Sequence, residues 1–200
     1  MQDAYVGSWA RESQLSAEIL GSLRDLNHRF LDLAAARTGW MAGQVAALSA
    51  AQRAAAAGCP YALFDLRFQD DGHWRARLQS LRSWGVEDES AVDDPGDNNT
   101  AGFVRLALFY AWHVASSERI KAQVLLGMNG GTADEFRRIT VNQLPVLAAT
   151  EARHLSARWS GCTAYWSALT AAALRADSRA LRRVQLHGLQ LAAASRLPGP

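Results

Sequence analysis

Apolar residues between positions 12 and 36 recur with a helical period, and this pattern constrains the fold more than any other feature of the sequence. The stripe comprises Leu15, Ile19, Leu23, Leu26, Phe30 and Leu33. At 3.6 residues per turn, its spacings of three and four residues place all its members on one side of a helix. An apolar stripe of this kind packs against another helix, in the same chain or in a partner. Its first five residues are therefore candidates for a partner interface.

The remainder of the chain also favours helices. Apolar spacing and turn residues predict helices over 40–47, 49–57, 71–84, 100–126, 132–138, 140–150, 162–175 and 178–194. In two short stretches, apolar and polar residues alternate instead. The first has Phe64, Leu66 and Phe68 as its apolar positions, and the second covers residues 154–159. Period-two alternation is typical of half-buried strands. We therefore expect a mainly α protein with two short strands.

The order of these elements repeats after a shift of 91 residues. Gln52 then coincides with Gln143, Arg67 with Arg158, and Leu78 with Leu169. Identity is low, but each half reads as a helix with a capping sequence, a short strand that ends in Arg and an aromatic residue, and another helix. The sequence thus predicts two related units that form a pseudo-dimer within one chain.

An acidic, turn-rich stretch separates the two predicted units. Residues 86–99 contain Pro95 and Gly96 among six Asp and Glu residues, a composition typical of a linker. We therefore expect an N-terminal helical unit at 1–85 and a C-terminal helical unit at 100–200.

Charge is distributed unevenly between the two ends of the chain. Residues 1–136 carry a net charge of −5 and residues 137–200 a net charge of +7, within a total of +2. A basic end is typical of a surface that faces nucleic acid, although the same arginines can be solvated charges on the outer faces of helices. A hydrophobic content of 49% is sufficient for a large core.

Several classes of protein are disfavoured by the sequence. No apolar run approaches the roughly 18 residues of a membrane-spanning helix, and the N-terminus lacks the pattern of a signal peptide. We therefore expect a cytoplasmic protein that does not contact a membrane. Two cysteines, Cys59 and Cys162, lie outside any metal-ligand spacing.

Catalytic and metal-binding motifs are absent from the sequence. The five histidines fall in separate predicted elements, and none has a second histidine three or four positions away. In the stretch from Asp70 to His73, the Asp71 side chain is expected to cap a helix. Capping boxes are expected at Ser49, Thr132 and Thr140. The sequence therefore predicts a non-enzymatic protein without a metal or cofactor.

The segment from Lys121 to Thr150 is the most suggestive of function. It reads as a helix, a glycine-containing turn, a short helix, a tight turn and a second helix, which is the connectivity of helix-turn-helix DNA readers. Arginine suits phosphate contacts, and Asn and Gln are residue types that read adenine edges. The candidates for DNA contact are Arg137, Arg138, Asn142, Gln143, Arg153, Arg158, Arg182 and Arg183.

One family resemblance emerges from this segment. The stretch Leu126-Gly127-Met128-Asn129, the Thr140-x-x-Gln143 pair, and Arg158-Trp159 resemble FlhD, a subunit of the flagellar transcriptional activator. The similarity covers about residues 105–170 and, in weaker form, residues 48–78. The resemblance implies a dimerising helical regulator that works with a zinc-bearing FlhC-type partner at promoters.

Two hypotheses follow. The first is a transcription regulator subunit that acts through a protein partner and, in its DNA-binding form, contacts double-stranded promoter DNA through the basic half. The alternative is an adaptor, chaperone or assembly factor of a larger machine that binds no DNA. Both are compatible with an oligomer.

Overall fold

A computed structural model describes residues 2–37, 40–83 and 98–195, with side chains placed from residue 16 onward except at 38–42, 82–98 and 196–200. The helices are α1 (Gln2–Ala35), α2 (Trp40–Ala46), α3 (Ala50–Ala56), α4 (Asp71–Ser83), α5 (Asn98–Ser117), α6 (Arg119–Leu126), α7 (Gly130–Phe136), α8 (Leu144–Glu151), α9 (Thr163–Leu174) and α10 (Ser178–Ala194). Two single-turn 3-10 helices, η1 (Val141–Gln143) and η2 (Ala152–His154), flank α8, and β1 (Phe64–Asp65) and β2 (Ser156–Ala157) form a two-stranded sheet. The expectation of a mainly α protein is confirmed. Within the described residues, no helix is both long and apolar enough to cross a bilayer.

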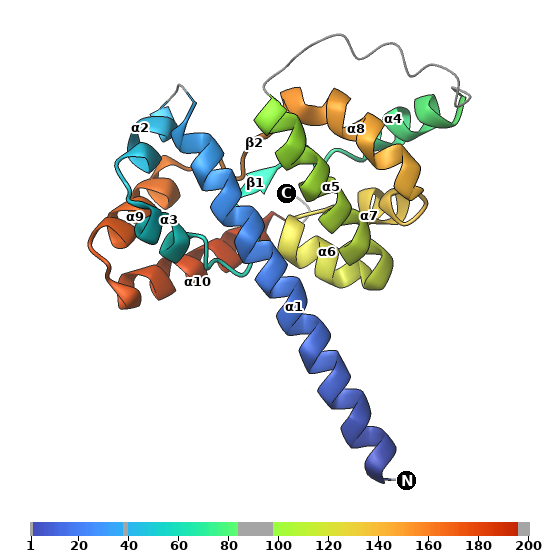
Figure 1. Ribbon diagram of the computed structural model, residues 1–200, viewed down its shortest axis with the longest axis horizontal. Coiled ribbons are helices and arrows are strands. Elements are labelled where there is room, and N and C mark those ends of the chain that lie inside the picture. Colours follow the sequence, from blue (N-terminus) through green and yellow to red (C-terminus); the bar gives the residue numbers. More distant parts are fainter. Residues whose placement is uncertain (1, 38–39, 84–97, 196–200) are drawn as a thin grey trace.

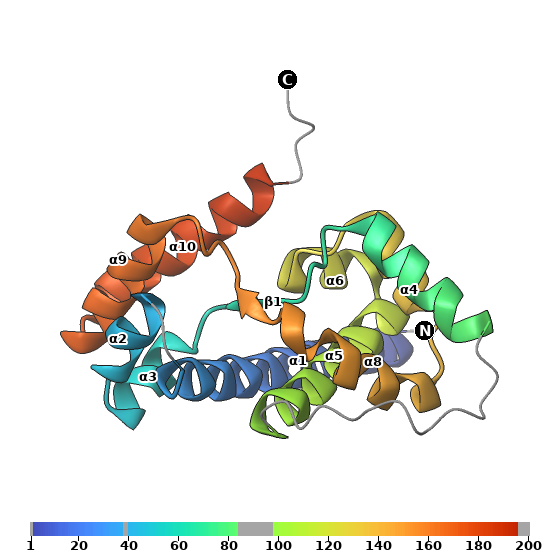
Figure 2. The same cartoon turned by 90° about the horizontal axis from the view of Figure 1, so that it is seen from above.

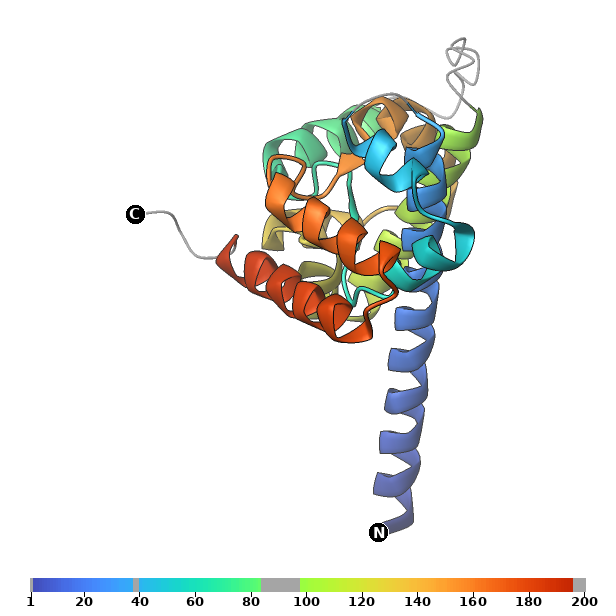
Figure 3. The ribbon, with the colours of Figure 1, turned by 90° about the vertical axis from the view of Figure 1, so that its left-hand side faces the viewer.

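The long helix α1 carries the apolar stripe. Its N-terminal part extends away from the body of the molecule (Figure 1; Figure 3). Its C-terminal half packs against α2, α3 and α5, and there Ile19, Leu23, Leu26 and Phe30 are all buried. These four candidates for a partner interface thus lie in the core of this chain, while the side chain of Leu15 lies outside the described residues.

The same order of elements occurs twice along the chain. A long helix, a short helix, a capping box that opens a helical turn, a short strand and a further helix appear as α1, α2, α3, β1 and α4. In the second series the long helix is broken into α5 and α6, and α7, η1 with its capping box, α8, β2 and α9 follow. The capping boxes expected at Ser49 with Gln52 and at Thr140 with Gln143 are both present.

The two strands pair with each other and lie between two groups of helices (Figure 2). They run antiparallel, with Phe64 opposite Ala157 and Asp65 opposite Ser156. Asp65 therefore faces the residue found 91 positions later, the same shift as in the predicted repeat. Both strands are shorter than the alternating stretches that predicted them.

After each strand, the chain crosses to the group of helices formed mainly by the other half of the sequence. The helix α4, which follows β1, packs against α7, whereas α9, which follows β2, packs against α2 and α3. Figure 1 shows α2, α3, α9 and α10 on one side of β1 and α4, α6, α7 and α8 on the other. Buried side chains of both expected units, 1–85 and 100–200, form one hydrophobic cluster. Most of the expected linker at 86–99 lies outside the described residues.

Three local expectations are corrected by the structure. The helix expected over 100–126 breaks at Glu118, whose extended backbone (φ −157°) separates α5 from α6. The cap of α4 is Asp70 rather than Asp71, since Asp70 Oδ1 accepts the His73 N–H at 2.9 Å. Thr132 lies inside α7 and forms no capping box, because its N–H and hydroxyl donate instead to Asp71 Oδ1 at 2.8 and 2.7 Å. The last two errors share one cause, since Asp71 bonds to Thr132, 61 residues away, instead of capping α4.

A single asparagine fixes α1 to the chain that leads into β1. The fully buried amide of Asn27 donates to the carbonyls of Ala57, Cys59 and Tyr61 at 3.3, 3.3 and 2.9 Å. Its carbonyl accepts the N–H of Leu63 at 2.8 Å. A buried polar side chain is favourable only when it is hydrogen-bonded. Asn27 meets this condition by bonding to backbone groups of a loop that has no regular secondary structure to pair them.

We expect Asn27→Ala to lower the free energy of unfolding by about 3 kcal/mol, because each buried backbone group left without a partner costs about 1–3 kcal/mol. Urea denaturation followed by circular dichroism measures this change. Arg24→Ala, an exposed substitution one turn earlier in α1, is the control and should alter stability by less than about 0.5 kcal/mol. Equal effects of the two substitutions would contradict this role of Asn27.

The helix α10 approaches the core closely at one glycine. A Cβ atom at Gly188 would collide with the hydroxyl of Tyr61, whereas a Cβ atom at Gly21 in α1 would meet nothing within 4 Å. We expect Gly188→Ala to destabilise the protein by about 1–3 kcal/mol through overpacking. Gly21→Ala should instead stabilise it by about 0.5–1 kcal/mol through helix propensity. Thermal unfolding of the two variants distinguishes packing from propensity by the sign of the change.

Candidate functional site

The segment formed by α7, η1 and α8, which contains four of the eight candidates for DNA contact, attaches to the body through one face. Phe136, Ile139, Leu144 and Leu147 are buried in the hydrophobic cluster. They lie where α7 and α8 pack against α5. The opposite face of the segment is therefore left to solvent.

Three candidates lie on that solvent face. Arg137, Arg138 and Asn142 are exposed, and Arg138 pairs with Glu135 at 3.2 Å. The amide of Gln143 is occupied, since its Oε1 accepts the N–H of Thr140 at 3.0 Å in the capping box. This end of the segment thus presents two guanidinium groups and one amide.

An apolar patch adjoins these polar groups. The side chains of Val141 and Val146 are 45% and 42% exposed, and Pro145 between them is also exposed. The solvent face of η1 and α8 is therefore apolar in its centre and basic at its edge.

The remaining arginine candidates are not gathered there. Arg158 is 4% exposed; its Nη1 donates to the carbonyl of Leu125 at 3.1 Å, and its guanidinium lies 4.6 Å from the centre of the Trp159 ring. Arg182 and Arg183 are exposed on α10, which lies on the other side of the sheet from α7 and α8 (Figure 1). The eight candidates therefore do not form one continuous surface.

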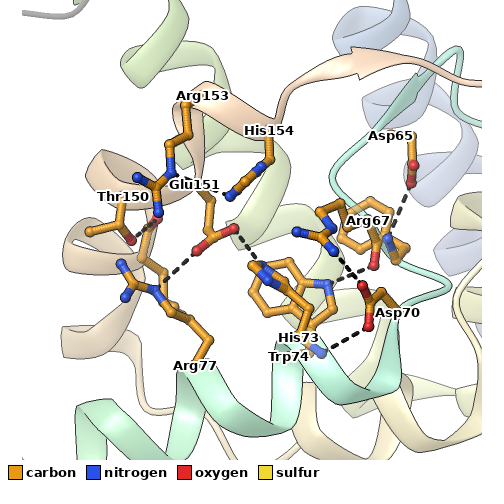
Figure 4. Close-up of polar contacts among 12 residues, drawn as sticks. Asp65, Arg67, Asp70, His73, Trp74, Arg77, Thr150, Glu151, Arg153 and His154 are labelled. Atoms are coloured by element: carbon orange, nitrogen blue, oxygen red, sulfur yellow. Dashed lines mark hydrogen bonds and ion pairs between the residues drawn. The ribbon is translucent and has the colours of Figure 1, made fainter.

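A second cluster of polar side chains lies between α4 and α8 (Figure 4). The carboxylate of Glu151, at the end of α8, is 1% exposed. His73 Nε2 lies 2.8 Å from its Oε2, and Arg77 Nε lies 3.0 Å from its Oε1. An ionised carboxylate is stable in a buried position only when it is paired in this way. The ion pairs join a helix of the first half of the chain to a helix of the second.

His154, in η2, completes this cluster. Its ring centre lies 5.2 Å from that of His73, and Arg153 Nε donates to its Nε2 at 3.3 Å. Burial lowers the pKa of His154 below the ordinary value of 6.5, although the nearby Glu151 carboxylate raises it. The neutral imidazole is thereby favoured, with its Nε2 as the acceptor of the Arg153 N–H.

One ligand atom each from His73, Glu151 and His154 lie within 4.8 Å of one another. The sequence prediction of no metal-binding residues missed this cluster because it searched for paired histidines within one element. The signal that was present is the Glu151-x-x-His154 spacing, since residues three apart on a helix share a face. The third member, His73, comes from a helix that is distant in sequence.

A buried group of hydroxyl and thiol side chains lies near the sheet. The hydroxyls of Tyr61 and Tyr165 are 3.1 Å apart, and Cys59 Sγ is 3.8 Å from the latter. Burial raises the pKa of the Cys59 thiol to about 11, so this thiol remains protonated and unreactive at neutral pH. Cys59 is buried and Cys162 is half-buried, and both are free.

Comparisons with known proteins identify no relative: no family model, curated protein or solved structure matches this chain. A function for this protein therefore has to be inferred from two of its surfaces, the α7–η1–α8 face and the cluster around Glu151.

We expect Arg77→Ala to destabilise the protein by about 3 kcal/mol at neutral pH, because it removes one of the two partners of a buried carboxylate. Chemical denaturation measures the loss. Arg75→Ala, two residues earlier in α4 and exposed, removes the same charge without touching Glu151. Its effect should stay within about 0.5 kcal/mol, and a similar loss in both variants would refute the ion pair as a source of stability.

Proposed function

We propose that this protein is a non-enzymatic subunit of a transcription regulator, which acts in the cytoplasm through a protein partner and through promoter DNA. The observation that carries the proposal is the solvent face of α7, η1 and α8. Exposed Arg137, Arg138 and Asn142 lie there beside an apolar patch, on a segment whose opposite face is buried.

The α7–η1–α8 segment has the connectivity of a helix-turn-helix reader, with α8 in the place of the recognition helix. The two arginines at the turn suit phosphate contacts, which fix a protein on DNA without reading its sequence. Asn142, at the start of the second element, has the donor and acceptor pair that reads adenine. Gln143 is excluded from this role because it forms the capping box.

The repeated order of elements supports the resemblance to FlhD. We interpret α1 to α4 and α5 to α9 as two related units, joined through β1 and β2 about a pseudo-twofold axis at the Asp65–Ser156 pair. One chain would then provide what two subunits provide in a dimer.

The apolar patch formed by Val141, Pro145 and Val146 is the proposed contact with the protein partner, which by resemblance would be an FlhC-type subunit. Aliphatic side chains with more than 40% of their surface exposed gain free energy when a partner covers them. The neighbouring arginines would form the polar rim that surrounds such contacts.

A second candidate function, an adaptor or assembly factor that binds no DNA, is favoured by the placement of the other arginines. Arg158 is buried, and Arg182 and Arg183 lie on the far side of the sheet from Arg137. The exposed arginine candidates therefore lie on different elements, Arg137 and Arg138 in the turn before η1, Arg153 in η2, and Arg182 and Arg183 on α10, and a protein partner alone would account for the apolar patch.

The two functions differ in their response to salt. Fluorescence anisotropy with duplex DNA from the host promoters, with and without the copurified partner, should show binding that weakens steeply as salt rises. The double variant Arg137→Ala/Arg138→Ala should weaken binding and reduce the slope of log K against log salt by about 2. The matched control, Arg182→Ala/Arg183→Ala, removes the same charge from α10 and should leave that slope unchanged.

Equal losses in the two double variants would assign DNA binding to general charge and contradict a dedicated face. Absence of salt-sensitive binding, with the partner still captured by the wild-type chain and released by Val146→Asp, would establish the adaptor function instead.

A further inference from the structure

We propose that His73, Glu151 and His154 form a binding site for one divalent transition-metal ion, of which Zn²⁺ fits the donor set best. The proposal is independent of DNA binding and goes beyond the function proposed above. It starts from one ligand atom of each residue, all three lying within 4.8 Å of one another.

The ligands come from two helices that face each other. Glu151 and His154 are three residues apart where α8 continues into η2, the spacing at which a carboxylate and an imidazole project from one side of a helix. His73 lies in the first turn of α4. Figure 4 shows the rings of His73 and His154 on either side of the Glu151 carboxylate.

The distances require little rearrangement. Ligand atoms about 2.1 Å from a tetrahedral zinc ion lie about 3.4 Å from one another. His73 Nε2 and Glu151 Oε2 are now 2.8 Å apart, the separation of two atoms that share a proton. Replacing that proton by a metal ion widens this contact by about 0.6 Å, and turning the His154 ring closes the remaining gap.

The donor set also specifies the kind of ion. Two imidazole nitrogens and one carboxylate oxygen suit zinc and its first-row neighbours, whereas Mg²⁺ and Ca²⁺ require mainly oxygen ligands. Three protein ligands leave a coordination position for water. The buried Glu151 carboxylate supplies negative charge in a place where it is poorly screened.

Two arginines border the site and set its affinity. Arg77 Nε holds Glu151 Oε1 at 3.0 Å and leaves Oε2 directed at the histidines, as outer partners orient metal-binding carboxylates. Arg153 Nε donates to His154 Nε2 at 3.3 Å, and this exposed side chain can turn into solvent when an ion binds. Because both arginines repel a cation, we expect weaker binding than at a closed structural zinc site.

A bound ion would join the two halves of the chain. His73 belongs to α4, and the other two ligands belong to α8 and η2. The ion would therefore stabilise the contact of α4 with the helices of the second half of the chain. Zinc binding would then stabilise the folded protein in proportion to the free ion concentration.

Isothermal titration of the chelator-treated full chain with Zn²⁺ tests the proposal, and the visible absorption of bound Co²⁺ reports the ligand geometry. We expect one ion per chain. Zinc at about one hundred times its dissociation constant should raise the melting temperature by roughly 5–10 °C. His73→Gln and His154→Gln should each weaken binding by at least about tenfold.

Matched controls are His113→Gln and His187→Gln, which replace exposed histidines on α5 and α10, and Cys162→Ser, which removes the more accessible thiol. All three should bind zinc as the wild-type chain does. His154→Gln retains both ion pairs of Glu151, so its loss of binding cannot be attributed to unfolding when circular dichroism is unchanged. Absence of saturable binding, or binding that survives both site variants, would overturn the proposal.

Discussion

The antiparallel pairing of β1 with β2 is the interaction on which the arrangement of the helices depends. Two residues per strand are too few to be stable alone, so the pair persists because its surroundings are buried: Leu63, Phe64 and Leu66 have no exposed surface. A flanking backbone bond from the Arg158 N–H to the Leu63 carbonyl at 2.9 Å extends the pairing, and the Ala62 N–H donates to the carbonyl of Leu125 in α6 at 2.7 Å, which ties the chain before β1 to that helix. This crossing point directs α4 and α9 onto opposite groups of helices.

Buried polar side chains make that arrangement specific. Hydrophobic burial is non-directional, and a cluster of aliphatic and aromatic residues alone would tolerate several registers of α1. The Asn27 side chain is hydrogen-bonded in only one of these registers of α1, the register in which its amide donates to three carbonyls of the chain before β1. Glu151 acts similarly on α4, because any displacement of that helix would leave the carboxylate without His73 and Arg77. The apolar core supplies most of the stability, and these two residues select the geometry.

The two candidate surfaces belong to the same segment but differ in physical character. The solvent face of η1 and α8 is apolar with a basic edge, which suits a macromolecule that covers it. The end of α8 and the following η2 place Glu151 and His154 against α4. Burial there keeps water away, so that electrostatic interactions of these side chains are weakly screened. Both surfaces thus lie on one short helix, α8, whose end carries Glu151.

The sequence by itself determined the local structure. Apolar spacing located α1 and α10, the Ser49 and Thr140 capping boxes fixed two helix starts, and the two alternating stretches contain β1 and β2. Only the tertiary structure decided which side chains meet. It buried Arg158, turned Asp71 from a cap into a partner of Thr132, and brought His73 to Glu151. Helical period and capping depend on neighbours within about four residues, whereas these contacts depend on how distant helices pack, which local spacing does not encode.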